Sequence, residues 1–187
     1  DVLAPLLNAL KPLGVPEERI TFFIGTGTHS MTTDELPRIL AQEIIDRCPV
    51  VIHDCDTSPM IDLGETTRGT PIKINAEFYN CDLKITVGNV EPHHFMGFSG
   101  GVKTAAIGLA SRETITQNHA MLTHPKAKTG IFHVNPMRQD LEEIGRKMGI
   151  HFSLSTILDE EKNILKVYFG DPQIVMKRTI PGIREIF

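Results

Sequence analysis

Four side chains in this sequence could transfer protons, form a covalent bond to a cofactor or bind a metal. They are His29, His93, Lys103 and His119. Histidine titrates near neutral pH and is a common metal ligand, and a lysine that loses its charge on burial becomes a nucleophile. A single histidine on an apolar surface usually only packs, so the hypothesis depends on the segments that carry these residues.

The first segment is the glycine-rich loop Gly25-Thr26-Gly27-Thr28-His29, which follows the apolar run at residues 20–24. Glycines let a backbone approach a ligand closely, and ligands of open parallel sheets bind beyond the carboxyl ends of the strands. We therefore predict that Thr26 and Gly27 contact a cofactor and that His29 projects into the crevice. The simpler alternative is a turn with a solvent-facing histidine.

The second segment, residues 91–104, follows the apolar run at residues 83–87. Ser99-Gly100-Gly101 stands just before a predicted helix and could bind a phosphate through its backbone N–H groups. Lys103 falls in the first turn of that helix, where a cation opposes the helix dipole. An anionic ligand or covalent chemistry would explain this placement, whereas the alternative is a solvated surface lysine.

A P-loop is a weaker interpretation of the same segment. Gly97 and Lys103-Thr104 stand at the spacing of that motif, but Val102 occupies the position of the glycine that must precede the lysine. We therefore rank an NTPase below the alternative that follows.

His119 lies on a predicted helix over residues 113–122 and shares a face with Ile115 and Leu122. It becomes a candidate only because His93 and Lys103 precede it. His53 ends a predicted strand and could line the crevice. The other histidines and the cysteines are predicted to be surface groups and small buried hydrophobes, respectively: His124, His133 and His151, and Cys48, Cys55 and Cys81.

Strand and helix signals alternate along the chain, which indicates α/β architecture. We expect a mostly parallel or mixed, Rossmann-like sheet flanked by helices, with a C-terminal β-hairpin. The predicted strands are residues 20–24, 50–53, 71–74, 83–87, 152–158 and 164–169. The predicted helices are residues 3–10, 34–47 capped by Thr33, 104–109, 113–122 and 140–148, with a turn at 75–80 and a last helix from Pro172. Residues 54–70 and 88–101 are expected to be mainly loops.

Composition excludes several classes. The chain has 187 residues, enough for a single α/β domain over residues 1–187. Its formal net charge of −4 argues against a nucleic-acid partner, and it has no apolar run long enough for a membrane span. Three cysteines without paired spacing and no visible secretory signal favour a cytoplasmic location.

The order and spacing of the two loops and His119 resemble those of the nickel-dependent lactate racemase family. The matching residues are Gly25-Thr26-Gly27-Thr28-His29, Pro92-His93, the run from Gly97 to Lys103, and His119. The resemblance covers nearly the whole chain and implies a truncated N-terminal domain of a larger two-domain enzyme.

The resemblance implies a cofactor and a role for each matched residue. The cofactor is a nickel pincer nucleotide, pyridinium-3,5-bisthiocarboxylic acid mononucleotide, joined covalently to Lys103 as a thioamide. His119 would bind the nickel, and His29 and His93 would be the catalytic acid/base pair. Ser99, Gly100 and Gly101 would hold the phosphate, while His94 is treated as a neighbour. The implied partners are a small 2-hydroxy acid, the missing C-terminal domain and the cofactor-biosynthesis proteins.

These roles are chemically consistent. Removing the α-proton of a 2-hydroxy acid would place a carbanion beside a carboxylate, whereas removing the hydrogen as hydride avoids that dianion. One base takes the hydroxyl proton, and hydride returning to the other face of the keto acid inverts the centre. Each enantiomer needs a base on its own side, which explains two histidines. Sulfur and imidazole donors suit nickel in a square-planar site.

The sequence also departs from the family pattern. Ser30 stands where members often have arginine, and an acidic/Arg motif that binds substrate would lie upstream of this chain. We therefore expect the 187-residue chain to be inactive alone. Two alternatives remain: a non-redox phosphate- or nucleotide-binding module that uses the Ser-Gly-Gly loop, and a structural domain whose histidines merely pack.

Overall fold

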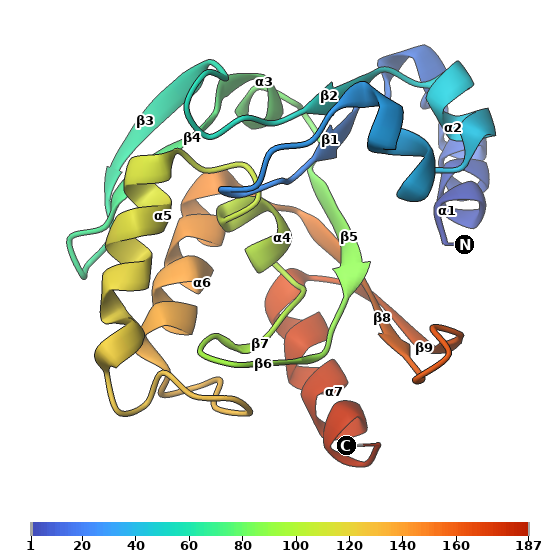
Figure 1. Ribbon diagram of the computed structural model, residues 1–187. Coiled ribbons are helices and arrows are strands. Elements are labelled where there is room, and N and C mark those ends of the chain that lie inside the picture. The colour runs from blue at the N-terminus through green and yellow to red at the C-terminus, as the bar shows by residue number, and fades with distance from the viewer. Residues whose placement is uncertain (1, 187) are drawn as a thin grey trace.

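The computed structural model describes residues 2–186, whereas Asp1 and Phe187, the two ends of the predicted domain, lie outside the described residues. Helices and strands are interspersed along the chain, with runs of strands such as β2–β4 and of helices such as α4–α6 (Figure 1). Within the described part, the strands form four small sheets, with the orders β1–β2, β3–β4, β5–β8–β9 and β6–β7. The predicted α/β class is therefore confirmed.

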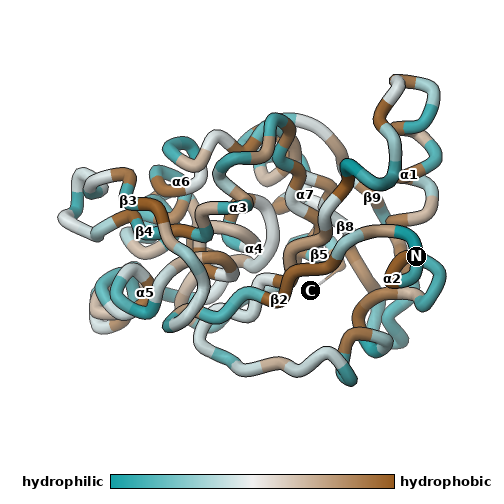
Figure 2. Tube along the Cα trace, turned by 90° about the horizontal axis from the view of Figure 1, so that it is seen from above, coloured by the Kyte–Doolittle hydropathy of each residue, from teal (hydrophilic) through white to brown (hydrophobic). Residues whose placement is uncertain are grey.

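Two apolar runs form the parallel pair β1 (Phe22–Ile24) and β2 (Val50–Ile52), with Phe22 opposite Val50. Figure 2 shows hydrophobic residues along β2 and β5. Continuous apolar runs are typical of strands that are covered on both faces. In this chain, however, every residue of β1 and β2 is only half-buried.

The second parallel pair, β5 (Ile85–Asn89) and β8 (Phe152–Leu158), carries the predicted C-terminal hairpin. β9 (Ile164–Gly170) pairs antiparallel with β8, which confirms the hairpin and makes this sheet mixed. The following helix α7 (Pro172–Arg184) is capped by the side chain of Asp171. It contacts β8 and β9 and buries its apolar side against them (Figure 1).

The prediction of one Rossmann-like sheet is not confirmed. β3 (Met60–Glu65) and β4 (Pro71–Asn75) form an antiparallel hairpin and pair only with each other. In residues 2–186, no ladder of hydrogen bonds joins β5 to β1 or β2. The hairpin β3–β4 thus extends neither parallel pair, and the described strands form separate small sheets instead of one continuous sheet.

The predicted helix over residues 34–47 is wrong. The segment contains a 3₁₀ helix, Thr33–Arg38, and a short α-helix, α2 (Gln42–Arg47). Pro37 lies inside the first piece and has no N–H to donate, which disfavours a continuous α-helix. The cap is Thr32 rather than Thr33, and Thr32 exchanges hydrogen bonds with Glu35.

Three helices support the segments that sequence analysis singled out. α4 (Lys103–Ala106) packs against α6 (Pro136–Met148), and α5 (Arg112–His119) lies beside α6 (Figure 1). α6 begins four residues before the predicted residue 140, because Asn135 caps it and Pro136 occupies its first turn. The main core lies between these helices and β4.

The other elements agree broadly with prediction. The first helix has the predicted bounds, and the segment over residues 88–101 contains a small hairpin that was not predicted. Their bounds are α1 (Leu3–Leu10), α3 (Ala76–Tyr79), β6 (Pro92–His93) and β7 (Gly97–Phe98), with 3₁₀ turns at Lys11–Leu13, Glu17–Arg19 and Ala120–Thr123. Among residues 2–186, no helix combines the length and apolar character needed to cross a bilayer.

Candidate cofactor and acid/base site

His93 is positioned by the hairpin β6–β7. His93 pairs with Gly97 across the hairpin, and the Met96 N–H donates to His93 Nδ1 over 3.4 Å. Gly97 has φ +79°, and a Cβ there would overlap the carbonyl oxygen of Ile131. Glycine is therefore required at the turn that fixes the half-buried His93 ring.

An aromatic ring joins His93 to His119. The Phe95 ring meets the His93 ring edge to face, with centroids 4.7 Å apart, and meets the His119 ring in the same way at 5.5 Å. Residues from the hairpin and from the end of α5 therefore lie in one cluster. Sequence analysis did not single out Phe95.

The tautomer of His119 follows from one hydrogen bond. His119 Nδ1 lies 2.8 Å from the carbonyl oxygen of Ile115, and because a carbonyl oxygen accepts, Nδ1 carries the hydrogen. A neutral ring then keeps the lone pair on Nε2, as in metal sites where the second ring nitrogen donates to a backbone carbonyl. The predicted shared face with Leu122 is wrong because α5 ends at His119 and Leu122 is 49% exposed.

Lys103 is the first residue of α4 and so lies in the first turn of that helix as predicted, although the helix was predicted over residues 104–109 and ends at Ala106. Burial lowers its pKa, the charge of Arg138 lowers it further, and Glu91 opposes both effects. Burial also lowers the pKa of His93 to about 4, with further contributions from the Lys103 and His94 charges, then from His119 and Arg138. Burial lowers the pKa of His119 too, and Lys103 adds to that effect. The charge of Lys103 thus acts on both histidines, and the charge of His119 acts on His93, so the three side chains lie in one region of the structure.

The Ser99-Gly100-Gly101 segment is closely packed against its own loop. The Ser99 hydroxyl accepts from the Glu91 N–H over 2.9 Å and donates to the Asn89 carbonyl oxygen over 3.2 Å. A Cβ at Gly100 would overlap the Val90 side chain, and one at Gly101 would lie 2.7 Å from Met176. Both glycines have positive φ. Packing and backbone conformation therefore require these glycines whether or not a phosphate binds there.

The loop of His29 lies against the helix of Lys103. The Gly27 N–H donates to the Gly108 carbonyl oxygen over 3.1 Å, and a Cβ at Gly25 would lie 2.7 Å from the Thr104 carbonyl oxygen. The Thr26 hydroxyl donates to the His53 carbonyl oxygen over 2.5 Å. His29 is exposed, and in the described chain no hydrogen bond or ring contact joins its side chain to the other three residues. The structure therefore places the loop of His29 against the segment that carries Lys103. It does not bring the His29 ring into contact with His93, Lys103 or His119.

A comparison with known protein families identifies the family of this chain. Residues 1–130 match the family described as Lactate racemase N-terminal domain. The chain belongs to the lactate racemase N-terminal domain family. The resemblance on which the residue roles were predicted is thereby confirmed at the level of the family.

The lactate racemase-family chain is similar in sequence to lactate racemases of two bacteria. It is 31% identical to the lactate racemase of Lactiplantibacillus plantarum over 189 residues, covering 99% of this chain and 45% of that protein. It is 31% identical to the lactate racemase of Thermoanaerobacterium thermosaccharolyticum over 171 residues, covering 89% of this chain and 40% of that protein. The chain thus spans less than half the length of these relatives.

Solved structures of two proteins are also similar to this chain. The lactate racemase apoprotein from T. thermosaccharolyticum superposes with a TM-score of 0.94 and 28% identity, covering 99% of this chain and 45% of that one. A Thermotoga maritima protein superposes with a TM-score of 0.73 and 24% identity, covering 96% and 48%. The second likeness shows the fold alone.

Sequence analysis missed Arg138, whose charge lowers the pKa of both Lys103 and His93 in this lactate racemase-family chain. Arg138 is 0% exposed and lies in the first turn of α6. The argument from the helix dipole that singled out Lys103 applies equally to a cation at this position. That signal was present in the sequence, but it needed the start of α6 to be placed correctly.

His53, which sequence analysis left open, is a packed residue. It is 1% exposed, and its Nε2 lies 3.0 Å from the Ala110 carbonyl oxygen. Asn75 Nδ2 lies 3.4 Å from its Nδ1. The predicted burial of the cysteines holds for Cys48 and Cys55, whereas Cys81 is half-buried.

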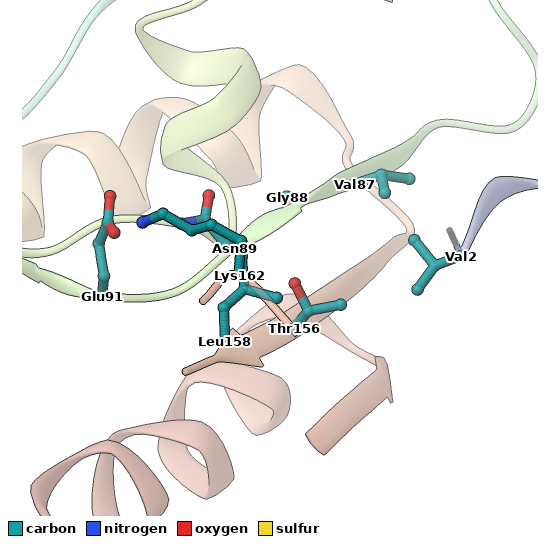
Figure 3. A pocket seen from close by; sticks show the side chains of 8 residues that line it. All are labelled: Val2, Val87, Gly88, Asn89, Glu91, Thr156, Leu158 and Lys162. Carbon is teal, nitrogen blue, oxygen red and sulfur yellow. The ribbon is translucent and has the colours of Figure 1, made fainter. Parts of the chain in front are cut away.

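A cavity of about 360 Å³ lies at the carboxyl ends of β5 and β8 (Figure 3). Val87 and Asn89 of β5 and Thr156 and Leu158 of β8 line it. Lys162 reaches over it from the turn between β8 and β9 toward Glu91 (Figure 3). The cavity is at the end of the parallel strands where ligands are expected, although Lys103, His93 and His119 do not line it.

Proposed function

We propose that the full-length protein containing this chain is a racemase or epimerase of small 2-hydroxy acids, and that this chain supplies its cofactor site. One observation carries the proposal. His93, Lys103 and His119 are separated by 10 and 16 residues in the sequence, yet Phe95 contacts both histidine rings and the charge of Lys103 lowers the pKa of both histidines. Their order matches the roles implied by membership of the lactate racemase N-terminal domain family.

The residues fit a nickel pincer nucleotide. Within residues 2–186, no group of three or more His, Cys, Asp and Glu side chains is arranged to hold a metal ion. A metal here would therefore need most of its ligands from a cofactor, and His119 Nε2 is free to supply one more. The lowered pKa of Lys103 favours the uncharged amine that a covalent link requires.

The protein's own groups would handle protons and position the reactants. The bound cofactor would supply reversible hydride acceptance. His93 would exchange a proton with the substrate hydroxyl oxygen on one face, and His29 would do so on the other. The His93 ring is fixed by Met96 and Phe95, so its direction is set before substrate binds.

Charge on Lys103 affects how His93 can act. The ammonium group lowers the pKa of His93, after burial the largest contribution. Conversion of the amine to an uncharged thioamide would remove that contribution. The pKa of His93 would then rise toward the range in which histidine both accepts and donates a proton.

Mass spectrometry of the peptide containing Lys103 tests the proposal. The full-length protein would be coexpressed with cofactor-biosynthesis proteins, and a lactate racemase known to become loaded would be processed in parallel. We expect a sulfur-containing nucleotide adduct on Lys103 and bound nickel. An unmodified Lys103, alongside a loaded reference enzyme, would contradict the proposal.

The same preparation separates the racemase from a non-redox nucleotide-binding module. A module of that kind would keep its nucleotide after Lys103→Ala and His119→Ala, and without nickel. The racemase proposal predicts that Lys103→Ala abolishes attachment and that His119→Ala reduces nickel retention. We expect the 187-residue chain by itself to show no racemisation.

A further inference from the structure

The position of Arg138 is unfavourable for the stability of α6. Arg138 is fully buried, and as a cation in the first turn of α6 it opposes the helix dipole. Its partner Glu142 follows one turn later, which is the less favourable order for an ion pair on a helix. Replacing a buried ion pair by apolar residues is often neutral or stabilising. The stability of α6 therefore does not explain why an arginine occupies this position.

The contacts of Arg138 point toward the loop instead. Its Nη1 donates to the Phe98 carbonyl oxygen over 2.9 Å, and its Nη2 donates to the Gly100 carbonyl oxygen over 3.1 Å. Its Nε donates to Glu142 Oε1 over 2.9 Å, which fixes the plane of the guanidinium. The group also lies over the Phe132 ring at 4.8 Å. The fork thus binds the two carbonyl groups on either side of Ser99.

These two carbonyl groups belong to the turn that delivers Lys103. After Gly100 the backbone stays in the left-handed region at Gly101 and then enters α4 at Lys103. A Cβ at Gly101 would lie 3.1 Å from Arg138 Nη2, so the backbone of the turn packs closely against the guanidinium group. Without these donors, both carbonyl groups would be buried and unpaired, which proteins avoid. The turn therefore depends on Arg138 for its conformation.

We propose that Arg138 is a positioning residue: by holding the carbonyl groups of Phe98 and Gly100, it fixes where α4 begins and thus places the Lys103 amine beside His93 and His119. The inference rests on the proposed function, in which Lys103 carries the cofactor. Arg138 itself touches neither substrate nor cofactor in this scheme.

Electrostatics agrees with this placement. The charged groups that act on Lys103 are Arg138 from α6, which lowers its pKa, and Glu91 from the loop before β6, which raises it. Lys103 in turn lowers the pKa of His93 and His119. The effect of Lys103 on His93 therefore reports how close the two side chains are.

A double-mutant cycle measures that closeness in the full-length protein without cofactor. The pKa of His93 would be followed by NMR of ring-labelled histidine, with Lys103 or Lys103→Met in the natural and Arg138→Lys backgrounds. Arg138→Lys keeps the charge, but an ammonium cannot bind both carbonyl groups as a planar fork. We expect Lys103→Met to raise the pKa of His93 in the natural background and to raise it by about half as much or less with Arg138→Lys.

An equal rise in both backgrounds would overturn the proposal. If Arg138→Lys does not fold, the paired change Arg138→Met with Glu142→Met leaves no buried charge unpaired and serves in its place. Loss of the coupling supports positioning, and retention of the coupling in that folded variant refutes it. Because no cofactor is present, this result is independent of whether Lys103 carries an adduct in the loaded protein.

Discussion

His119 donates a hydrogen bond from Nδ1 to the carbonyl oxygen of Ile115, 2.8 Å away and one helical turn earlier in α5. The bond fixes the ring plane and leaves Nε2 as the nitrogen with a free lone pair. A helix backbone thus orients a side chain that ends the helix. This relationship decides which nitrogen can serve a metal.

His119→Gln should reduce nickel retention by the loaded full-length protein, because glutamine lacks the imidazole lone pair. We expect at least a tenfold weaker hold on the metal, the order of effect known for disturbed metal sites. Nickel would be measured after gel filtration in chelator-containing buffer. His124→Gln, in an exposed turn five residues later, is the matched control and should retain nickel. Equal retention in both variants would remove His119 from the site.

The stability of the chain should fall as pH drops from about 6.5 toward 4. Burial lowers the pKa of His93 from 6.5 to about 4 and also lowers those of His53 and His119. The unfolded chain therefore binds protons first, so the free energy of unfolding decreases through this window. Above pH 6.5 and below pH 4, His93 contributes no pH dependence.

Urea unfolding between pH 7 and pH 4 would measure this slope. His93→Gln should make it shallower by at most about 1.4 kcal/mol per pH unit, the contribution of one proton. A different window belongs to Glu17, whose pKa is lowered to about 2 by hydrogen bonds from Arg47 and Lys11. Its effect appears below pH 4.5, so the two contributions separate. An unchanged slope in His93→Gln would show that the folded ring is not held neutral.

Gly97→Ala should destabilise the chain more than Gly64→Ala. Both glycines have φ near +80°, where an L residue costs about 1 kcal/mol. A Cβ at Gly97 would also overlap the Ile131 carbonyl oxygen, whereas one at Gly64 would meet nothing within 4 Å. The difference between the two variants in thermal or urea unfolding isolates the steric contribution. Equal losses would mean that the β6–β7 turn tolerates the methyl group, and His93 would then be less firmly placed.

His53→Ala should lower stability without affecting attachment of the cofactor to Lys103. The variant removes the partner of the Ala110 carbonyl oxygen and of the Asn75 side chain in a buried setting. Leaving such groups unpaired costs about 1–3 kcal/mol. The measurements are urea unfolding and the mass of the Lys103 peptide. A stable His53→Ala variant that fails to load would place His53 in the site instead.

The sequence predicted elements whose signals are local. The helix over Leu3–Leu10, the parallel runs that became β1 and β2, and the hairpin β8–β9 follow from periodicity, apolar runs and turn residues. The prediction of one helix over residues 34–47 failed because Pro37 lies inside the segment and the backbone there is a 3₁₀ helix.

The candidate site was predicted in part because its residue types are unusual for their positions. A lysine at a predicted helix start, such as Lys103, and histidines near glycines can be recognised from the sequence alone. The contacts of Phe95 with two imidazoles and of Arg138 with two carbonyl groups join residues 24 and 40 positions apart, respectively, which no local pattern encodes. The two glycines of the Ser-Gly-Gly segment can be explained in two ways. Phosphate binding requires glycine, but so does close packing against Val90 and Met176, and the sequence alone does not distinguish the two causes.

The backbone contact between Gly25 and Gly108 has a consequence for the relative positions of His29 and Lys103. The absence of side chains at both positions lets the loop before His29 lie directly on the chain that leaves α4. The distance between the two backbones therefore depends on these glycines, because a Cβ at Gly108 would lie 2.8 Å from the Gly25 Cα. A bulkier residue at either glycine would push the loop before His29 away from the segment that follows α4, and so would change the position of His29 relative to Lys103.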